Sequence, residues 1–294
     1  MNEPAVYRKR PGDRPDGRRL RSLDAYNTVI PFVMRSRSDS TNYFSDRLEM
    51  TEIDRYIRQK RADGMKGFGF LHLFIAAYIR TVSQRPALNR FVIGKRIFAR
   101  NNIEVVMTVK KEMTTAGTET SIKVVFSPAD TVADVYRRIS DAIADARGEE
   151  FNSTDKAADI VARMPRFLFS FFMFIVRTLD YFGAMPKALV RSSPFHGSLV
   201  ITDLGSLGIP PVFHHLYNFG NVPLFAAFGA KRRACELMAD GTVGQRKYLD
   251  YTVASDERIC DGFYFAQSFK YIKSLMRHPE VLEAPPESIV PDVD

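Results

Sequence analysis

The residues best placed to do chemistry lie together in one short stretch, residues 255–262, which we call the motif loop. It holds three carboxylates, of which Glu257 and Asp261 lie four residues apart; Cys260, next to Asp261, is expected to be a buried residue at the end of a strand. A free carboxylate has a pKa of about 4.3 and the thiol of a substrate about 8.5, so transfer of a proton from such a thiol to a carboxylate is uphill by roughly 6 kcal/mol. For an imidazole the same step costs roughly 3 kcal/mol. Burial raises the pKa of a carboxylate and would therefore bring it closer to the pKa of the thiol.

The composition predicts a globular chain with one sizeable core. It has 294 residues, of which 45% are hydrophobic and 12% aromatic. The two cysteines, Cys235 and Cys260, cannot form a disulfide framework, and with the histidines they show no metal-ligand spacing. The N-terminal residues show no apolar signal region. We therefore expect a cytoplasmic protein without a bound metal.

The net charge of +8 comes largely from a basic N-terminal arm. Proline, glycine and arginine alternate in residues 7–21, a composition that disfavours helix and core. Residues 1–22 are therefore expected to be a flexible, solvated or subunit-crossing arm; an anionic partner for it is the alternative. Its arginines do not alternate with aromatic residues, so we expect no specific nucleic-acid partner.

We expect one domain, residues 23–283, followed by a proline-rich tail, residues 284–294. Alternating and continuous apolar runs predict strands, and apolar spacing of three to four residues predicts helices. The expected strands are 43–50, 91–93, 103–109, 121–126, 198–202, 224–229 and 247–254, and the expected helices are 53–61, 71–82, 131–147 and 262–276. Thr51 is the expected cap of the first helix.

Several separated blocks resemble the catalytic core of the 2-oxoacid dehydrogenase acyltransferases, in the chloramphenicol acetyltransferase-like superfamily. The blocks lie in the expected order: residues 71–89 ending in Arg-Pro-Ala-Leu-Asn, 102–107, 198–208, 260–263 with Cys-Asp-Gly-Phe, and 275–282. The motif loop is similar to the signature His-x-x-x-Asp-Gly of these enzymes. Glu257 stands where the signature has its histidine.

This resemblance implies a two-layer α/β sandwich, with a large mixed β-sheet and helices on one side. It also implies a homotrimer whose active sites lie in channels between neighbouring subunits. Coenzyme A or acyl-coenzyme A would enter as a substrate from one side, and the acyl donor or acceptor molecule from the other. By position, Glu257 would take the place of the general base, Thr202 would donate to the oxyanion and Asp261 would be the structural carboxylate. Arg35 and Arg37 are candidate partners of Asp261.

Three interpretations of Glu257 remain open at this point. It is a tuned base for an altered acyl transfer, or a non-catalytic replacement in a structural or regulatory trimer, or another base takes its place. His214 and His215 are the candidates for that other base, because their segment follows the Thr202 strand.

Two further segments have sequences that suggest a specific role. Residues 167–176 are almost wholly apolar and too short to span a bilayer. We expect a core or subunit-contact helix there, with a lid over an acyl pocket or a membrane contact as alternatives. Lys156 lies in an Asp-Lys-Ala sequence like that of lipoyl domains, but its surroundings read as helix. We therefore expect no lipoyl attachment.

Overall fold

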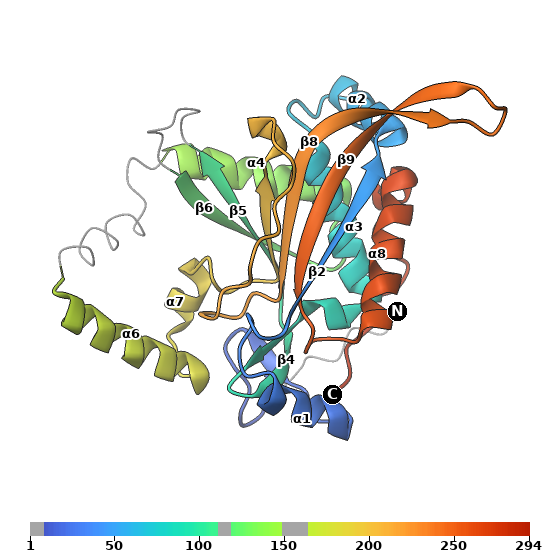
Figure 1. The fold of residues 1–294 in the computed structure, drawn as a ribbon. Coiled ribbons are helices and arrows are strands. Elements are labelled where there is room, and N and C mark those ends of the chain that lie inside the picture. The colour runs from blue at the N-terminus through green and yellow to red at the C-terminus, as the bar shows by residue number, and fades with distance from the viewer. Residues whose placement is uncertain (1–8, 111–118, 149–163) are drawn as a thin grey trace.

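The computed structural model describes residues 9–110, 119–148 and 164–294 as a two-layer α/β structure (Figure 1). The strands are β1 (Gly17–Arg19), β2 (Thr41–Glu49), β3 (Arg90–Ile93), β4 (Arg96–Arg100), β5 (Ile103–Lys110), β6 (Glu119–Phe126), β7 (Leu199–Asp203), β8 (Leu224–Leu237) and β9 (Val243–Asp256). The helices are α1 (Ala25–Val33), α2 (Thr51–Ala62), α3 (Phe70–Gln84), α4 (Val132–Gly148), α6 (Arg166–Tyr181), α7 (Lys187–Ser192) and α8 (Gly262–Arg277), with 3-10 turns at Pro86–Asn89, Gly205–Leu207 and Pro279–Leu282.

The main sheet is mixed, in the order β2-β9-β8-β7-β5-β6. Strand β7 is parallel to both of its neighbours, β5 and β8, and the other neighbouring pairs are antiparallel. Strands β7 and β8 begin as continuous apolar runs because they are buried on both faces. A parallel pair cannot be joined by a tight turn, so the chain must travel back the length of β7 before β8 can start.

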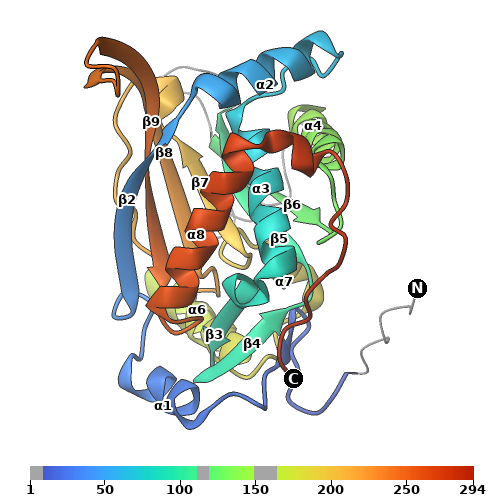
Figure 2. The ribbon, with the colours of Figure 1, turned by 90° about the vertical axis from the view of Figure 1, so that its right-hand side faces the viewer.

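Helices cover one face of this sheet, which we call the inner face. Figure 2 shows α3 and α8 side by side against it, with α4 beyond α3. Of the described helices, α3 is the most deeply buried, with every residue from Leu73 to Ser83 buried. It is apolar on all sides because it is enclosed by the sheet and by its helical neighbours. The main core therefore lies between the sheet and α3.

The opposite, outer face is covered by chain without regular helices or strands. After β7 and its 3-10 turn, residues 208–223 run back over the sheet to the start of β8. Leu216 and Val222 of this return segment pack on Val200 and Phe225 in a small second core. The return segment also carries His214 and His215, so the parallel β7–β8 pair explains why they lie over the sheet.

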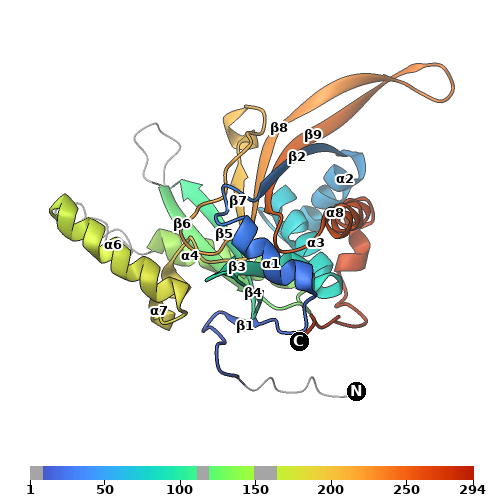
Figure 3. The same cartoon turned by 60° about the horizontal axis from the view of Figure 1, so that its bottom comes forward.

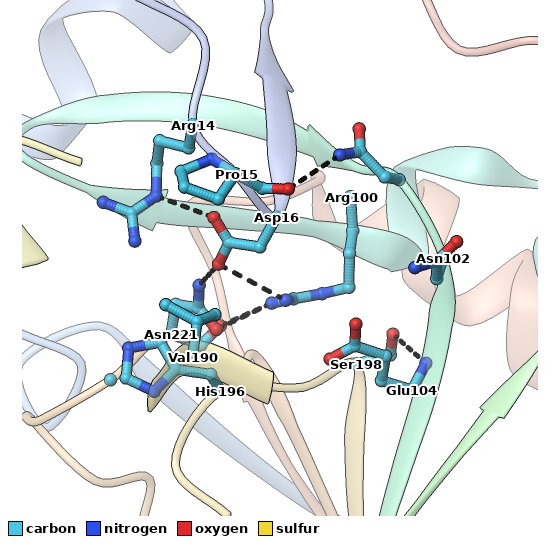
Figure 4. A network of polar contacts seen from close by, with 12 residues as sticks. Arg14, Pro15, Asp16, Arg100, Asn102, Glu104, Val190, His196, Ser198 and Asn221 are labelled. Atoms are coloured by element: carbon cyan, nitrogen blue, oxygen red, sulfur yellow. Dashed lines mark hydrogen bonds and ion pairs between the residues drawn. The ribbon is translucent and has the colours of Figure 1, made fainter. Parts of the chain in front are cut away.

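A small sheet, in the order β1-β4-β3, lies at one end of the main sheet and anchors the N-terminal region. Asp16 lies between two buried arginines (Figure 4): it accepts a hydrogen bond from Arg14 Nε at 3.0 Å and lies 3.8 Å from the Arg100 guanidinium. Asn221 Nδ2 donates to the same carboxylate at 2.6 Å. Arg14 also pairs with Asp180 of α6 at 2.7 Å. These contacts form one buried polar network, joining the N-terminal region, β4, the return segment and α6.

The described part of the N-terminal arm therefore differs from the expected flexible arm. Residues 17–19 form β1 against β4, and the C-terminal tail packs beside them. Arg10 pairs with Asp294 at 2.7 Å, and Arg18 donates to the backbone oxygens of the last residues. Arg10 and Arg18 thus find their partners at the other end of the chain, more than 270 residues away, which no local sequence pattern reports.

Most of the expected helices and strands are present, with boundaries shifted by a few residues. One expectation is wrong: Thr51 is the first residue of α2 rather than its cap, and its hydroxyl donates to Glu49 instead. For the phenylalanine-rich helix the structure excludes one part of the expectation, the core of the subunit, because α6 stands away from the body (Figure 3). Most of its apolar side chains are exposed, and a subunit contact, a lid and a membrane contact stay open as predictions. Lys156 lies outside the described residues. Among the described helices, none combines the length and apolarity that crossing a bilayer requires.

The buried network makes a testable prediction for stability. Asp16→Asn removes the negative charge between Arg14 and Arg100, and we expect it to lower the free energy of unfolding by about 3 kcal/mol. Asp145→Asn on the exposed side of α4 is the matched control and should change it by less than about 0.5 kcal/mol. Denaturant unfolding at pH 7 measures both.

The buried Asp16 carboxylate should also make the free energy of unfolding depend on pH. Burial by itself raises the pKa of Asp16, but the charges of Arg14 and Arg100 outweigh it and hold the pKa below its ordinary value. Its contribution is therefore present above about pH 4 and is lost as the pH falls through the lowered pKa. Wild-type protein should lose stability on acidification more steeply than Asp16→Asn. If the free energy of unfolding fell equally steeply with pH in both proteins, Asp16 would not be the group responsible.

Candidate functional site

The motif loop connects the end of β9 to the start of α8, and Glu257 is its most exposed position before Asp261. The Glu257 backbone N–H donates to Ser40 O at 2.9 Å, which ties the loop to the residue before β2. Its carboxylate makes no hydrogen bond or ion pair with any residue that the structure describes. Glu257 is therefore exposed to solvent in the isolated subunit. Only a neighbouring molecule could bury its carboxylate.

A buried ion pair inside the loop holds its shape. Asp256 binds Arg258 through both carboxylate oxygens, at 2.8 Å to Nε and 2.7 Å to Nη2, and also accepts from Ser40 Oγ at 3.0 Å. Arg258 then donates to Met34 O at the end of α1. Both side chains are almost fully buried, so the pair fixes the backbone on either side of Glu257.

Asp261 caps α8. Its side chain accepts from the backbone N–H of Tyr264 at 2.8 Å, which satisfies one of the unpaired donors of the first helical turn. Neither Arg35 nor Arg37 pairs with it in the described structure. Arg37 instead donates to the carbonyl oxygens of Tyr217 and Val92, and burial lowers its pKa to about 10. The structural carboxylate paired with arginine in this loop is Asp256, not Asp261.

Glu257 lines a groove of about 620 Å³ between the edge strand β2 and α8, which we call the edge groove. Its floor is aromatic: Phe44 packs edge-on against Phe265 and Phe269, with ring centroids 5.3 and 4.5 Å apart. Lys270, Lys273 and Arg277 line its other end, at the C-terminal part of α8, where Lys273 pairs with Asp46 of the same groove at 2.6 Å. The edge groove could take an elongated apolar group with an anionic end.

Thr202 lies in a different groove, of about 610 Å³, on the outer face of the sheet; we call it the face groove. His214 lines the same groove, and its ring stacks flat on Phe225 at 3.8 Å. His214 Nδ1 lies 3.0 Å from the carbonyl of His215, whose exposed ring stacks on that of His214. The structure thus brings Thr202 and His214 together, with His215 at the surface beside them.

Thr202 and Glu257 of one chain do not meet. Thr202 pairs with Ala227 and Ala227 with Thr252, which places Thr202 two strands away from β9. Glu257 lies five residues beyond Thr252. Strands about 4.8 Å apart and a rise of about 3.3 Å per residue put the two Cα atoms roughly 19 Å apart. The two side chains also open into separate grooves, so one subunit cannot present both to one substrate.

Sequence reasoning missed Asp256 and Arg258, because in the resemblance Asp256 lies just before the signature and Arg258 is one of its variable positions. The signal available was their i,i+2 placement next to a tight turn, where a carboxylate and a guanidinium can face each other. It also missed the aromatic floor of the edge groove. Phe44 comes from β2, while Phe265 and Phe269 lie more than 200 positions further along the chain on α8.

The environment of Cys260 predicts an unreactive thiol. Burial is the main cause that raises its pKa to about 12, so little thiolate is present near neutral pH. At pH 8 we expect native Cys260 to react with iodoacetamide at least about 100-fold more slowly than the exposed Cys235. Mass spectrometry of alkylated peptides measures both, with unfolded protein as the control in which the rates converge. Equal rates in the native protein would show that the loop is open.

Comparison with known proteins gives a fold but no family assignment. No family model matches the sequence, and no curated protein matches it. Among solved structures, a probable dihydrolipoamide acetyltransferase from Listeria monocytogenes is similar, with TM-score 0.57 and 14% identity over 88% of this chain and 94% of that one.

Three further structures agree with this comparison. The dihydrolipoamide acetyltransferase (E2p) of Azotobacter vinelandii has TM-score 0.57 and 12% identity over 88% of both chains, as has the cubic core of a pyruvate dehydrogenase multienzyme complex. A chloramphenicol acetyltransferase has TM-score 0.52 and 12% identity over 87% of this chain and 99% of that one. The chain therefore has the chloramphenicol acetyltransferase-like fold, as its sequence blocks predicted.

Proposed function

We propose that this chain is a coenzyme A-dependent acyltransferase that works as a homotrimer. It moves an acyl group between a thioester and a thiol or hydroxyl acceptor, in a channel between subunits. The observation that carries this proposal is the placement of Thr202 and Glu257. They lie in separate grooves of one chain, so a working site needs Glu257 of one subunit and Thr202 of its neighbour.

The similar structures support the reaction class. Two are named as acetyltransferases of dihydrolipoamide and one as an acetyltransferase of chloramphenicol, so their acceptors are a thiol and a hydroxyl compound. A further one forms the cubic core of a multienzyme complex, which supports an assembly of several subunits. The proposed substrates are therefore coenzyme A or acyl-coenzyme A and an acyl donor or acceptor that arrives from the other side.

The proposed chemistry assigns one role to each group. The base takes the proton of the acceptor thiol or hydroxyl as its sulfur or oxygen attacks the thioester carbonyl. The Thr202 hydroxyl donates to the oxyanion that forms. The carbonyl then re-forms, the coenzyme A sulfur leaves with the electron pair and the base returns the proton to it. Glu257 is the base when the neighbouring subunit buries it; His214, already beside Thr202, is the alternative.

One observation favours a second candidate, a catalytically inactive homologue that acts as a structural or regulatory trimer. Glu257 is exposed and Asp261 serves as a helix cap, so neither has the surroundings that a tuned acid–base pair needs in this subunit. The loop itself remains rigid through Asp256 and Arg258, as a scaffold would require.

Complementation tests whether the site is shared between subunits. Glu257→Gln and Thr202→Ala should each be inactive alone. If the two variants are unfolded together and refolded as mixed trimers, about a quarter of the sites regain both wild-type residues and activity returns. Each variant refolded alone is the control. A site contained in one subunit would show no recovery in any mixture.

Binding and turnover together separate the enzyme from the scaffold. We expect coenzyme A thioesters to bind in calorimetric titration, and Thr202→Ala to lower kcat about 100-fold or more. If Glu257 is the base, Glu257→Gln abolishes turnover while His214→Gln retains it; the reverse identifies His214. Absence of binding by every thioester, from acetyl to long chain, would favour the inactive trimer.

A further inference from the structure

The α6–α7 region, residues 164–192, exposes more large apolar side chains than any other described segment of similar length. Figures 1 and 3 show α6 standing off the body of the subunit. Phe167, Phe174 and Phe171 are 77%, 65% and 60% exposed. Exposed apolar groups gathered in this way mark a contact surface rather than scattered surface variation.

The exposed apolar side chains of α6 cover about half of its circumference. Leu168, Phe171, Phe172, Ile175 and Leu179 recur at three- and four-residue spacing and form one continuous stripe, which the exposed Phe167 and Phe174 widen on one side. Arg166 and Arg177 are eleven residues apart, close to three turns, and lie on the side opposite the centre of the stripe. A helix with a broad exposed apolar surface and arginines beyond its margin fits a membrane–water interface.

The exposed charges of this region all have one sign. Its basic residues Arg166, Arg177, Lys187 and Arg191 are exposed and make no ion pair with any described residue. The single acidic residue between positions 164 and 193 is Asp180. It is buried, where it pairs with Arg14 at 2.7 Å and lies 3.2 Å from His196 Nε2. The surface beside the apolar stripe is therefore uniformly cationic.

The Asp180 contacts also hold α6 in place. They join the last turn of the helix to the network around Asp16, and Gly183 follows with a positive φ of 71° that turns the chain toward α7. The helix is formed and oriented before it meets a partner, so binding costs little further ordering of its backbone.

We propose that α6 docks this protein on an anionic lipid surface, with its apolar stripe among the acyl chains and its arginines at the headgroups. Sixteen residues rise about 24 Å, less than the roughly 30 Å of a bilayer core, so the helix lies along the interface rather than across it. Pairing of two α6 helices with each other fits less well, because it would set these basic residues against each other; in a trimer α6 would instead meet a different surface of its neighbour, which the test below separates from lipid.

The absence of tryptophan from the chain allows a direct test. Phe171→Trp places a single tryptophan in the stripe, and Leu237→Trp places one at the far tip of the β8–β9 hairpin as the control. On adding phosphatidylcholine vesicles with 30% phosphatidylglycerol, emission of Phe171→Trp should shift to shorter wavelength, while that of Leu237→Trp should not.

Vesicle flotation of the otherwise wild-type full chain supplies the quantitative test. Each basic residue near an anionic leaflet contributes a factor of about five, so Arg166→Gln with Arg177→Gln should lower the partition coefficient about 25-fold. Phe171→Glu with Ile175→Glu should abolish flotation, whereas Leu237→Glu with Val243→Glu at the hairpin tip should not. Circular dichroism checks that each variant is folded.

Two outcomes would overturn the proposal. Emission of Phe171→Trp that stays unchanged at saturating vesicle concentration would show that the stripe does not enter lipid. Emission already at short wavelength without vesicles, and dependent on protein concentration, would show that another copy of the chain covers α6. Neither outcome bears on acyl transfer, because α6 contributes no residue to the face or edge groove.

Discussion

Strand β7 is parallel to both of its neighbours, and this pairing determines where each candidate catalytic group lies. Because a parallel pair needs a long return, residues 208–223 cross the outer face and bring His214 over the groove that contains Thr202. The antiparallel β8–β9 pair then carries the chain to the opposite end of the sheet, where Glu257 follows β9. A site that uses both ends of the sheet can form only where two subunits meet.

Buried ion pairs hold the segments that this topology separates. Asp256 and Arg258 shape the motif loop, while Asp16, with Arg14 and Arg100, ties the N-terminal region to β4 and the return segment. Such pairs add little stability over an apolar core, but breaking one leaves a charge uncompensated in a medium that solvates it poorly. They therefore specify one arrangement of the loops rather than supplying most of the folding free energy.

In the described part of the subunit, the surfaces to which we assign a function differ in their chemistry. The edge groove is aromatic with a basic end, the face groove gathers Thr202 and His214, and α6 is apolar with cationic flanks. The two grooves lie on the body of the subunit, whereas α6 projects away from it (Figure 1). Placing an acyltransferase fold at a lipid surface would bring it close to apolar acyl groups, which the phenylalanine floor of the edge groove is suited to accept.

The sequence by itself determined the helices and strands with clear periodicity, the order of the motif blocks and thus the fold, because these depend on residues close together in the chain. It could not show that Arg14, Asp180 and Asp16 form one network, since their partners are up to 166 residues apart. It also gave no way to tell an apolar helix in the core from one at the surface, which is why both were kept open for α6 until the structure excluded the core. Tertiary structure decided the distance between Thr202 and Glu257, because this depends on how β7, β8 and β9 pair. It also decided which distant groups hold the Asp256–Arg258 pair, namely Ser40 Oγ and Met34 O.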